Sequence, residues 1–371
     1  MLVGVPKEIK NHEYRVGLTP ASVNELVNHG HQVMVETGAG AKIGFDDTQY
    51  SAAGAEIVAN QDAVFDAAEM IVKVKEPQPC ECKKLSRDQI LFTYLHLAPD
   101  PQQTELLVES GASCIAYETV TDQYNSLPLL APMSEVAGRL SIIEGAHHMM
   151  VPMGGRGMLI SGVPGTAPAK VAIIGGGVVG YNAAIMALGL NADVSILDIN
   201  VNRLRQIYSD FGGKVRCIYS TKSAISEYCT EADLVVGAIL VPGASAVKLI
   251  KRELVSAMKE GAVLADVAID QGGCAETSHA TTHEKPTYVV DGVVHYCVAN
   301  MPGAVAQTST VALNNVTLPF VLTLANKGCK QALLDDQHLR NGLNVHQGMI
   351  TCEAVAEALD YEFVEATKAL G

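Results

Sequence analysis

A glycine-rich turn near the middle of the chain constrains its fold more than any other sequence feature. The segment Lys170–Gly180 reads KVAIIGGGVVG, so a mostly apolar run leads into glycines with the spacing G-x-G-x-x-G. The run predicts a strand, and Val178–Leu188 after it predicts a helix. Asp198 ends the next apolar run, eighteen residues after Gly180. Strand, glycine turn, helix and distant acid in this order predict a dinucleotide-binding βαβ unit.

Each residue of this fingerprint has a physical role. Gly175 permits a tight turn, Gly177 lets backbone N–H groups approach a pyrophosphate, and Gly180 lets helix and strand pack closely. The helix N-terminus adds partial positive charge. The Asp198 carboxylate accepts hydrogen bonds from ribose hydroxyls and repels a 2′-phosphate, which favours NAD over NADP. Arg203 keeps NADP open, because a nearby cation tolerates that phosphate. The alternative is a glycine-rich turn without a ligand.

Strand-like and helix-like segments alternate along the chain, which predicts parallel sheets. Before the glycine turn, helices are expected near 60–67 and 101–110, and strands at Leu2–Val5, Gln32–Glu36, Met70–Lys75, Ile90–Leu95 and Ser113–Tyr117. From the turn onward, strands are expected at 171–174, 193–197, 214–219, 233–236, 262–266 and 287–290.

Two longer helical patterns separate these series. One covers Met133–Met150, and the other follows Met301 to about Ala325, while residues 340–371 suggest helix and loop. We expect an α/β fold with two Rossmann-like domains, each a doubly wound and mostly parallel sheet, joined by two long helices. The NAD-binding Rossmann domain is expected at 130–305. A discontinuous substrate (catalytic) domain is expected at 1–129 plus 306–371.

Composition excludes several classes of protein. The net charge is −14 and no basic stripe occurs, which argues against nucleic acid and anionic membranes as partners. The start of the chain lacks the apolar core of a signal peptide, and no run of about 18 consecutive apolar residues occurs. Nine scattered cysteines suggest reduced thiols in a cytoplasmic protein. His279 and His283 have no obvious third ligand, and the adjacent His147 and His148 point to different faces, so no metal is expected.

Candidate chemical groups follow the strands of the first series. Arg15, Lys75 and His96 all lie at predicted carboxyl ends, where open α/β sheets bind ligands. An arginine there can hold a carboxylate, and a histidine can act as acid and base near neutral pH. Asp270 follows a strand of the second series and could pair with an amino group. The plainer alternatives are a solvated arginine, an edge-strand lysine, a core histidine and a turn aspartate.

Collinear motifs over nearly the whole chain resemble the alanine dehydrogenase family. They are GVPKEIKNHEYRVGLTP at 4–20, VKVKEP at 72–77, YLHLA at 94–98, APMSEVAGRL at 131–140, GVPGTAPAKVAIIGGGVVG at 162–180, DVAIDQGG at 266–273 and VANMPGAV at 298–305. The wider superfamily, with the transhydrogenase nucleotide-binding subunit and saccharopine-type dehydrogenases, shares some of them. The resemblance implies reversible, NAD-dependent oxidative deamination of L-alanine to pyruvate and ammonium by a homohexamer.

The resemblance also implies residue roles. Arg15 and Lys75 would bind the substrate, His96 would be the acid/base and Asp270 the second catalytic group. His279 would lie near the cofactor phosphates, where some relatives are expected to carry a cation such as arginine. The remaining implied cofactor contacts are Ser134, Gly175, Gly177, Val178, Val179, Gly180, Asp198, Arg203, Ser220, Ile239, Leu240, Val267, Ala268, Ile269, Asp270, Val298, Ala299, Asn300 and Met301.

Three other functions fit the same motifs. One is a saccharopine-type or carboxyethyl-ornithine-type enzyme that joins an amine to a keto acid. Another is a non-catalytic, NAD-binding, transhydrogenase-like subunit. The third is an NAD-sensing regulator, which would not need Arg15, Lys75 and His96 together.

Overall fold

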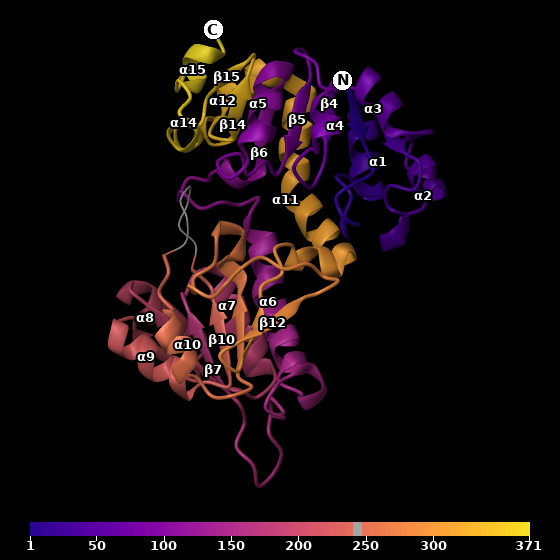
Figure 1. Ribbon diagram of the computed structural model, residues 1–371. Helices are drawn as coiled ribbons and strands as arrows, with labels where there is room; N and C mark the ends of the chain where they lie inside the picture. The colour runs from indigo at the N-terminus through magenta and orange to yellow at the C-terminus, as the bar shows by residue number, and fades with distance from the viewer. Residues whose placement is uncertain (240–246) are drawn as a thin grey trace. The chain divides into compact units, whose positions relative to one another are not determined.

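In a computed structural model of the chain, residues 1–239 and 247–371 are described, and they form two compact units (Figure 1). The first unit consists of Met1–Pro132 and Val305–Gly371, and the second of Met133–Ala304. Both are mostly parallel sheets with helices, which confirms the predicted fold class.

The first unit contains an eight-stranded sheet in the order β15-β14-β6-β5-β4-β1-β2-β3. The pairs from β3 to β6 are parallel, whereas β14 pairs antiparallel with both β6 and β15. Its strands are β1 (Leu2–Val5), β2 (Gln32–Glu36), β3 (Glu56–Val58), β4 (Met70–Val72), β5 (Ile90–Thr93), β6 (Ser113–Ala116), β14 (Leu343–His346) and β15 (Met349–Ile350).

Helices connect and cover this sheet. Thr19 caps α1 by accepting a hydrogen bond from the backbone of Ser22, with Pro20 at the first helical position. The helices are α1 (Pro20–Asn28), α2 (Asp47–Ala52), α3 (Gln61–Ala67), α4 (Pro79–Cys82), α5 (Pro101–Ser110), α11 (Ala306–Lys327), α12 (Cys329–Asp335), α13 (Gln337–Arg340), α14 (Glu353–Leu359) and α15 (Ala366–Ala369).

The second unit contains a seven-stranded sheet in the order β12-β13-β11-β10-β7-β8-β9, in which only the described pair β12–β13 is antiparallel. Its strands are β7 (Lys170–Ile174), β8 (Asp193–Asp198), β9 (Arg216–Tyr219), β10 (Leu234–Gly237), β11 (Val263–Asp266), β12 (Thr287–Val290) and β13 (Val293–Tyr296). Its helices are α6 (Ala131–His148, beginning at the boundary), α7 (Val178–Gly189), α8 (Val201–Asp210), α9 (Lys222–Glu231) and α10 (Arg252–Ala257).

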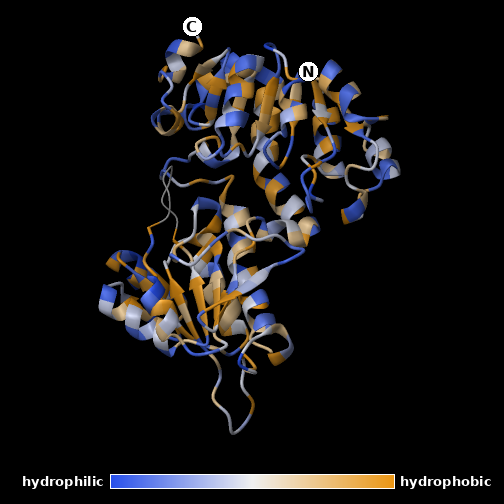
Figure 2. Ribbon diagram, viewed as in Figure 1, coloured by the Kyte–Doolittle hydropathy of each residue, from blue (hydrophilic) through white to orange (hydrophobic). Residues whose placement is uncertain are grey.

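The central strands of both sheets are apolar and buried. Val3 and Leu91 in one unit, and Ile173 and Val235 in the other, are fully enclosed. Figure 2 shows these strands as orange arrows, with blue concentrated on helices and loops. Continuous apolar strands are typical of parallel sheets whose two faces are both covered by helices.

The expected secondary structure differs from the observed one in several places. The C-terminal region contains the strand pair β14–β15, although its sequence suggested only helix and loop. The run Met70–Lys75 forms a strand only as far as Val72, because the side chain of Glu8 replaces a neighbouring strand as acceptor for the N–H groups of Val74 and Lys75. Strands β3 and β13 were not predicted, although all four residues of β13 are buried and β13 lies between β12 and β11 in the second sheet.

Helix α11 is long and apolar, yet it carries buried polar side chains. Among the described residues, Met301–Lys327 is the one helical stretch long and apolar enough to cross a membrane. The core helix of a soluble protein passes the same test. Here the buried Thr310 and Asn314 accept hydrogen bonds from the backbone N–H groups of Val16 and Thr19, at 3.3 and 2.8 Å. These contacts pack α11 against the segment that follows β1.

Candidate functional site

The strand order of the first unit brings the three predicted chemical groups to one edge of a sheet. Strands β5, β4 and β1 are parallel neighbours, so their carboxyl ends lie side by side. Arg15 lies in the loop after β1, Lys75 lies three residues after β4, and His96 lies three residues after β5. Parallel neighbours can be expected to present such residues to one common crevice.

Arg15 is buried and bound to a carboxylate of its own loop. Its Nε and Nη2 atoms donate to Glu13 at 2.7 and 2.6 Å, and its backbone N–H donates to the same carboxylate at 3.0 Å. Burial opposes the charged form, but Glu13 outweighs it, so the pKa of Arg15 is raised. The guanidinium is therefore a permanent, oriented cation. A side chain at Gly17 would overlap the carbonyl oxygen of Val72, so this loop lies tightly against the end of β4.

Lys75 is held by hydrogen bonds of its backbone and by an ion pair of its side chain. Its N–H donates to Glu8 at 3.1 Å, and its carbonyl accepts from the Thr93 hydroxyl at 3.0 Å. Its Nζ lies 3.7 Å from Glu76, which also pairs with Lys10. Burial raises the pKa of Glu76, but the two lysines outweigh burial and lower it.

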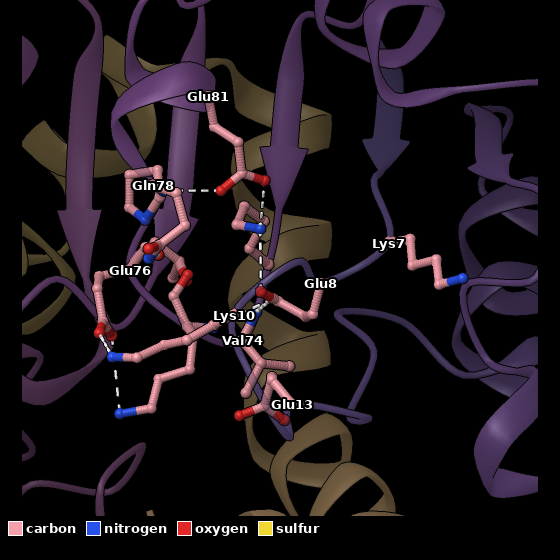
Figure 3. A network of polar contacts seen from close by, with 12 residues as sticks. Lys7, Glu8, Lys10, Glu13, Val74, Glu76, Gln78 and Glu81 are labelled. Carbon is pink, nitrogen blue, oxygen red and sulfur yellow. Dashed lines mark hydrogen bonds and ion pairs between the residues drawn. The ribbon is translucent and has the colours of Figure 1, made fainter.

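A buried ion triad, which was not among the groups predicted from the sequence, lies directly beside Lys75. The Nζ of Lys73 donates to Glu81 at 2.7 Å and to Glu8 at 3.0 Å, with all three side chains almost inaccessible to solvent. Figure 3 shows Glu8 and Glu81 within this network of polar contacts. Burial lowers the pKa of Lys73, but the two carboxylates outweigh it and raise the pKa, so the lysine stays charged. The pattern V-K-V-K could have indicated this triad, because two lysines in one predicted buried strand require charged partners.

His96 is half-exposed and has an unusual backbone conformation. Its φ is +50°, in the left-handed region that non-glycine residues rarely adopt. The Glu118 carboxylate accepts the N–H groups of Leu95 and His96, the latter at 2.6 Å. The imidazole stacks on Tyr94 with 5.8 Å between ring centroids and an interplanar angle of 4°. Glu118 and Tyr94 thus fix both the backbone and the ring of a histidine that solutes can reach.

The glycine turn of the second unit has the geometry that its spacing predicts. Gly175 has φ +107°, and a Cβ there would lie 2.6 Å from the carbonyl oxygen of Ala238. A Cβ at Gly180 would overlap the carbonyl oxygen of Gly175, so helix and strand are in close contact. Gly177, the N-cap of α7, faces open space. The open position in front of a helix N-terminus fits a pyrophosphate.

Asp198 and Arg203 both hold the glycine turn. Asp198 accepts the N–H of Gly176 at 2.7 Å, and its backbone carbonyl accepts the N–H of Ser220 at 3.0 Å. The Nε of Arg203 donates to the carbonyl of Gly176 at 2.6 Å. The guanidinium of Arg203 also lies over the ring of Tyr181, 5.0 Å from its centroid. The carboxylate and the cation therefore bind the two backbone polar groups of one turn residue, Gly176.

The other expected cofactor contacts lie along the same edge of the second sheet. Residues 267–271 form a short 3₁₀ helix directly after β11, with Asp270 exposed, and residues 298–301 follow β13. Ile239 follows β10, whereas Leu240 lies outside the described residues. Ser134 is on α6, where Gly138 contacts the carbonyl of Val179 at the start of α7.

A buried carboxylate that the sequence analysis overlooked supports the loop after Asp270. Asp266 is fully buried and accepts hydrogen bonds from the N–H groups of Cys274 and Ala275 and from the Ser278 hydroxyl, at 2.8, 3.2 and 2.6 Å. His279 comes next in this loop and stacks on Tyr288, with 3.7 Å between ring centroids. Within residues 1–239 and 247–371, no three His, Cys, Asp or Glu side chains gather closely enough to hold a metal.

The fold and the glycine turn together define a two-unit α/β protein of the dinucleotide-binding class. A model of the alanine dehydrogenase/PNT N-terminal domain matches residues 4–137, and a model of the C-terminal domain matches residues 141–353. The chain belongs to the alanine dehydrogenase/PNT family.

Known relatives match the chain over its full length. The protein named alanine dehydrogenase from Halomonas elongata is 58% identical over 371 residues, which is 100% of both chains. The one from Bacillus subtilis is 54% identical and covers 100% of this chain and 98% of its own. A solved L-alanine dehydrogenase has a TM-score of 0.93 at 53% identity, covering 97% of this chain and 99% of its own. The transhydrogenase from Sinorhizobium meliloti, at 23% identity and a TM-score of 0.80 over 95% and 100% of the two chains, shares the fold.

Proposed function

We propose that the chain is an NAD-dependent L-alanine dehydrogenase, which reversibly converts L-alanine, NAD and water to pyruvate, NADH, ammonium and a proton. The observation that carries this proposal is the convergence of Arg15, Lys75 and His96 at three adjacent strand ends. The high identity to proteins named alanine dehydrogenase supports the choice of substrate. In this proposal, residues 1–129 plus 306–371 act on the substrate and residues 130–305 carry NAD.

The two cations select an amino or keto acid through its carboxylate. Arg15 keeps its guanidinium oriented through Glu13, and Lys75 supplies a compact ammonium after the neighbouring strand β4. A carboxylate held by two fixed cations leaves the Cα atom in a defined position, which favours reaction.

The chain's own residues manage water and protons. NAD held by the second unit would supply the hydride acceptor. The substrate amine reacts in its neutral form, after one proton has left for solvent, and loss of the Cα hydride then leaves an iminium ion on the substrate. His96 takes a proton from the water that attacks the iminium carbon, and it returns that proton to the amine as the carbinolamine collapses to pyruvate and ammonium. Asp270 orients the amino group and stabilises the developing positive charge. The reverse sequence aminates pyruvate.

The residues of the second unit fit NAD better than NADP. Asp198 presents a carboxylate at the end of β8, where the adenosine ribose binds in this class of fold. The open space at Gly177 leaves room for the pyrophosphate at the start of α7. His279, Ser134 and the loops after β10, β11 and β13 complete the proposed cofactor site.

The proposed enzyme is a cytoplasmic homohexamer with small-molecule partners only. The acidic net charge of −14 disfavours nucleic acid and anionic membranes as partners. The hexameric state is proposed on family resemblance.

A direct assay tests the proposed function. Purified protein with NAD and L-alanine is expected to form NADH, measured by its near-ultraviolet absorbance, and to do so far more slowly with NADP. L-Lysine, or L-ornithine with pyruvate and NADH, should give little turnover. His96→Ala and Asp270→Asn are expected to lower kcat by about 100-fold or more while still binding NADH. Tight NADH binding without turnover of L-alanine would instead favour a non-catalytic binding subunit.

A further inference from the structure

The carboxylate of Glu8 binds three consecutive residues at the end of β4. One oxygen accepts the N–H groups of Val74 and Lys75, at 2.7 and 3.1 Å, and the other accepts the Lys73 ammonium at 3.0 Å. Glu8 itself is buried, with 2% of its side chain exposed. Figure 3 shows it between the strand ends of the first unit.

Glu8 acts where the backbone ladder between β1 and β4 stops. The two strands are in register only at Val3–Met70 and Gly4–Ile71. On the β5 side the ladder continues, because Lys73 donates to Phe92 and Tyr94 donates to Val74. On the β1 side, the Glu8 side chain therefore provides the acceptor for the backbone N–H groups of Val74 and Lys75.

The loop that follows β1 contacts both of the proposed substrate-binding cations, Lys75 and Arg15. Glu8 holds the backbone of Lys75, and Glu13, five residues later, holds the Arg15 guanidinium. The spacing between the two cations thus depends on how this loop is fixed to β4. We propose that Glu8 is a positioning residue that sets Lys75 at the distance from Arg15 needed to bind a substrate carboxylate. This inference rests on the proposed function.

Glu81 provides a matched control. It also binds Lys73, at 2.7 Å, and its second oxygen accepts a backbone N–H, but that N–H belongs to Gln78 in the capping of α4. Glu8→Ala and Glu81→Ala therefore each remove one buried carboxylate from Lys73 and leave backbone donors without that acceptor. Only Glu8→Ala releases the backbone of Lys75.

The test compares KM, kcat and NADH affinity for the wild-type protein and both variants. Glu8→Ala is expected to raise KM for L-alanine and pyruvate by about 10-fold or more with a smaller change in kcat, because ground-state and transition-state binding of the carboxylate weaken together. Glu81→Ala is expected to change KM by less than about 3-fold. Both variants should lose thermal stability, and neither should change NADH affinity.

Two outcomes overturn the positioning role: an unchanged KM in an active Glu8→Ala variant, or equal KM changes in both variants. If Glu8→Ala does not fold, Glu8→Gln replaces it. The glutamine amide cannot accept hydrogen bonds from the backbone and from Lys73 at both of its heavy atoms, so a smaller rise in KM is expected and an unchanged KM contradicts the role. A wild-type protein that does not oxidise L-alanine would overturn the proposed function itself.

Discussion

The same oxygen of Glu118 accepts the backbone N–H of His96 at 2.6 Å and lies 3.7 Å from Nδ1 of its ring. A left-handed backbone costs a non-glycine residue about 1–3 kcal/mol and persists only where surrounding contacts enforce it. Glu118 provides that enforcement through His96 and the preceding Leu95. A half-exposed histidine held in this way is suited to proton transfer.

Replacing Glu118 should separate its structural and chemical roles. Glu118→Ala leaves two N–H groups without their acceptor, so the free energy of unfolding is expected to fall by about 2–4 kcal/mol. Glu118→Gln keeps one acceptor oxygen and should lose less than about 1.5 kcal/mol, yet its kcat is expected to fall about 10-fold because the charge beside His96 is gone. Chemical denaturation and NADH formation measure the two quantities. Full activity in Glu118→Gln would show that the charge has no part in catalysis.

Alanine substitutions at two glycines of the same turn should affect different properties: protein stability at Gly180 and NADH affinity at Gly177. Gly180→Ala forces a Cβ into the carbonyl of Gly175 and is expected to destabilise the protein by at least about 3 kcal/mol. Gly177→Ala has open space and an ordinary φ of −66°, so its stability should stay within about 1 kcal/mol of wild type. Its methyl group would occupy the pyrophosphate position, so NADH binding should weaken by about 10-fold. Titration of NADH fluorescence tests this, and unchanged NADH affinity would remove Gly177 from the cofactor site.

Asp198 should determine the preference between the two nicotinamide cofactors. Asp198→Ala removes the carboxylate that disfavours a 2′-phosphate while Arg203 stays nearby, so the ratio of kcat/KM for NADP to that for NAD should rise about 10-fold or more. Asn200→Ala is the control, because Asn200 caps α8 in the same segment without the charge. An unchanged ratio in Asp198→Ala would place the ribose elsewhere.

His295 should make stability depend on pH. Burial lowers the pKa of this fully enclosed histidine below its ordinary 6.5. Its Nδ1 donates to the Val293 carbonyl, so Nε2 accepts from the Thr277 hydroxyl when the ring is neutral. Below pH 6.5 the unfolded chain binds a proton that the folded chain resists, so the free energy of unfolding should fall as pH falls through this window.

The matched variant for this effect is His295→Asn, which is expected to be less stable at about pH 8 but to lose less stability between about pH 7 and pH 5. Some dependence should remain, because burial also lowers the pKa values of His148 and His346. Equal slopes for variant and wild type would contradict the contribution of His295.

The sequence predicted the parts of the molecule that depend on local pattern. The turn around Gly175 and the strands before and after it follow from apolar runs and glycine spacing, because a βαβ unit is a local structure. The strands that precede Lys75 and His96 are parallel neighbours, so they end at one edge of the sheet, as the alternating pattern predicted. Strand β14 was missed because it pairs with β6, more than 200 residues earlier in the chain, and no local pattern reports such a partner.

Long-range side-chain partners were equally hidden. Nothing in the motif around Glu8 indicates that its carboxylate binds backbone groups of a strand that begins at Met70. Asp266 and Asp270 occur in one motif, yet only the fold shows that the first is buried and the second exposed. Position in a sequence motif predicts which strand end carries a residue, whereas burial decides whether that residue supports the site or reaches its ligand.

The most direct test of the central claim follows the hydrogen atom on Cα of the substrate. The protein is incubated with NAD and L-alanine carrying deuterium at Cα, and the mass of the NADH is measured together with the pyruvate formed. Hydride transfer from L-alanine predicts NADH that carries the deuterium, in an amount equal to the pyruvate. Unlabelled NADH, or no NADH with the cofactor bound, would contradict the assignment of this chain as an L-alanine dehydrogenase.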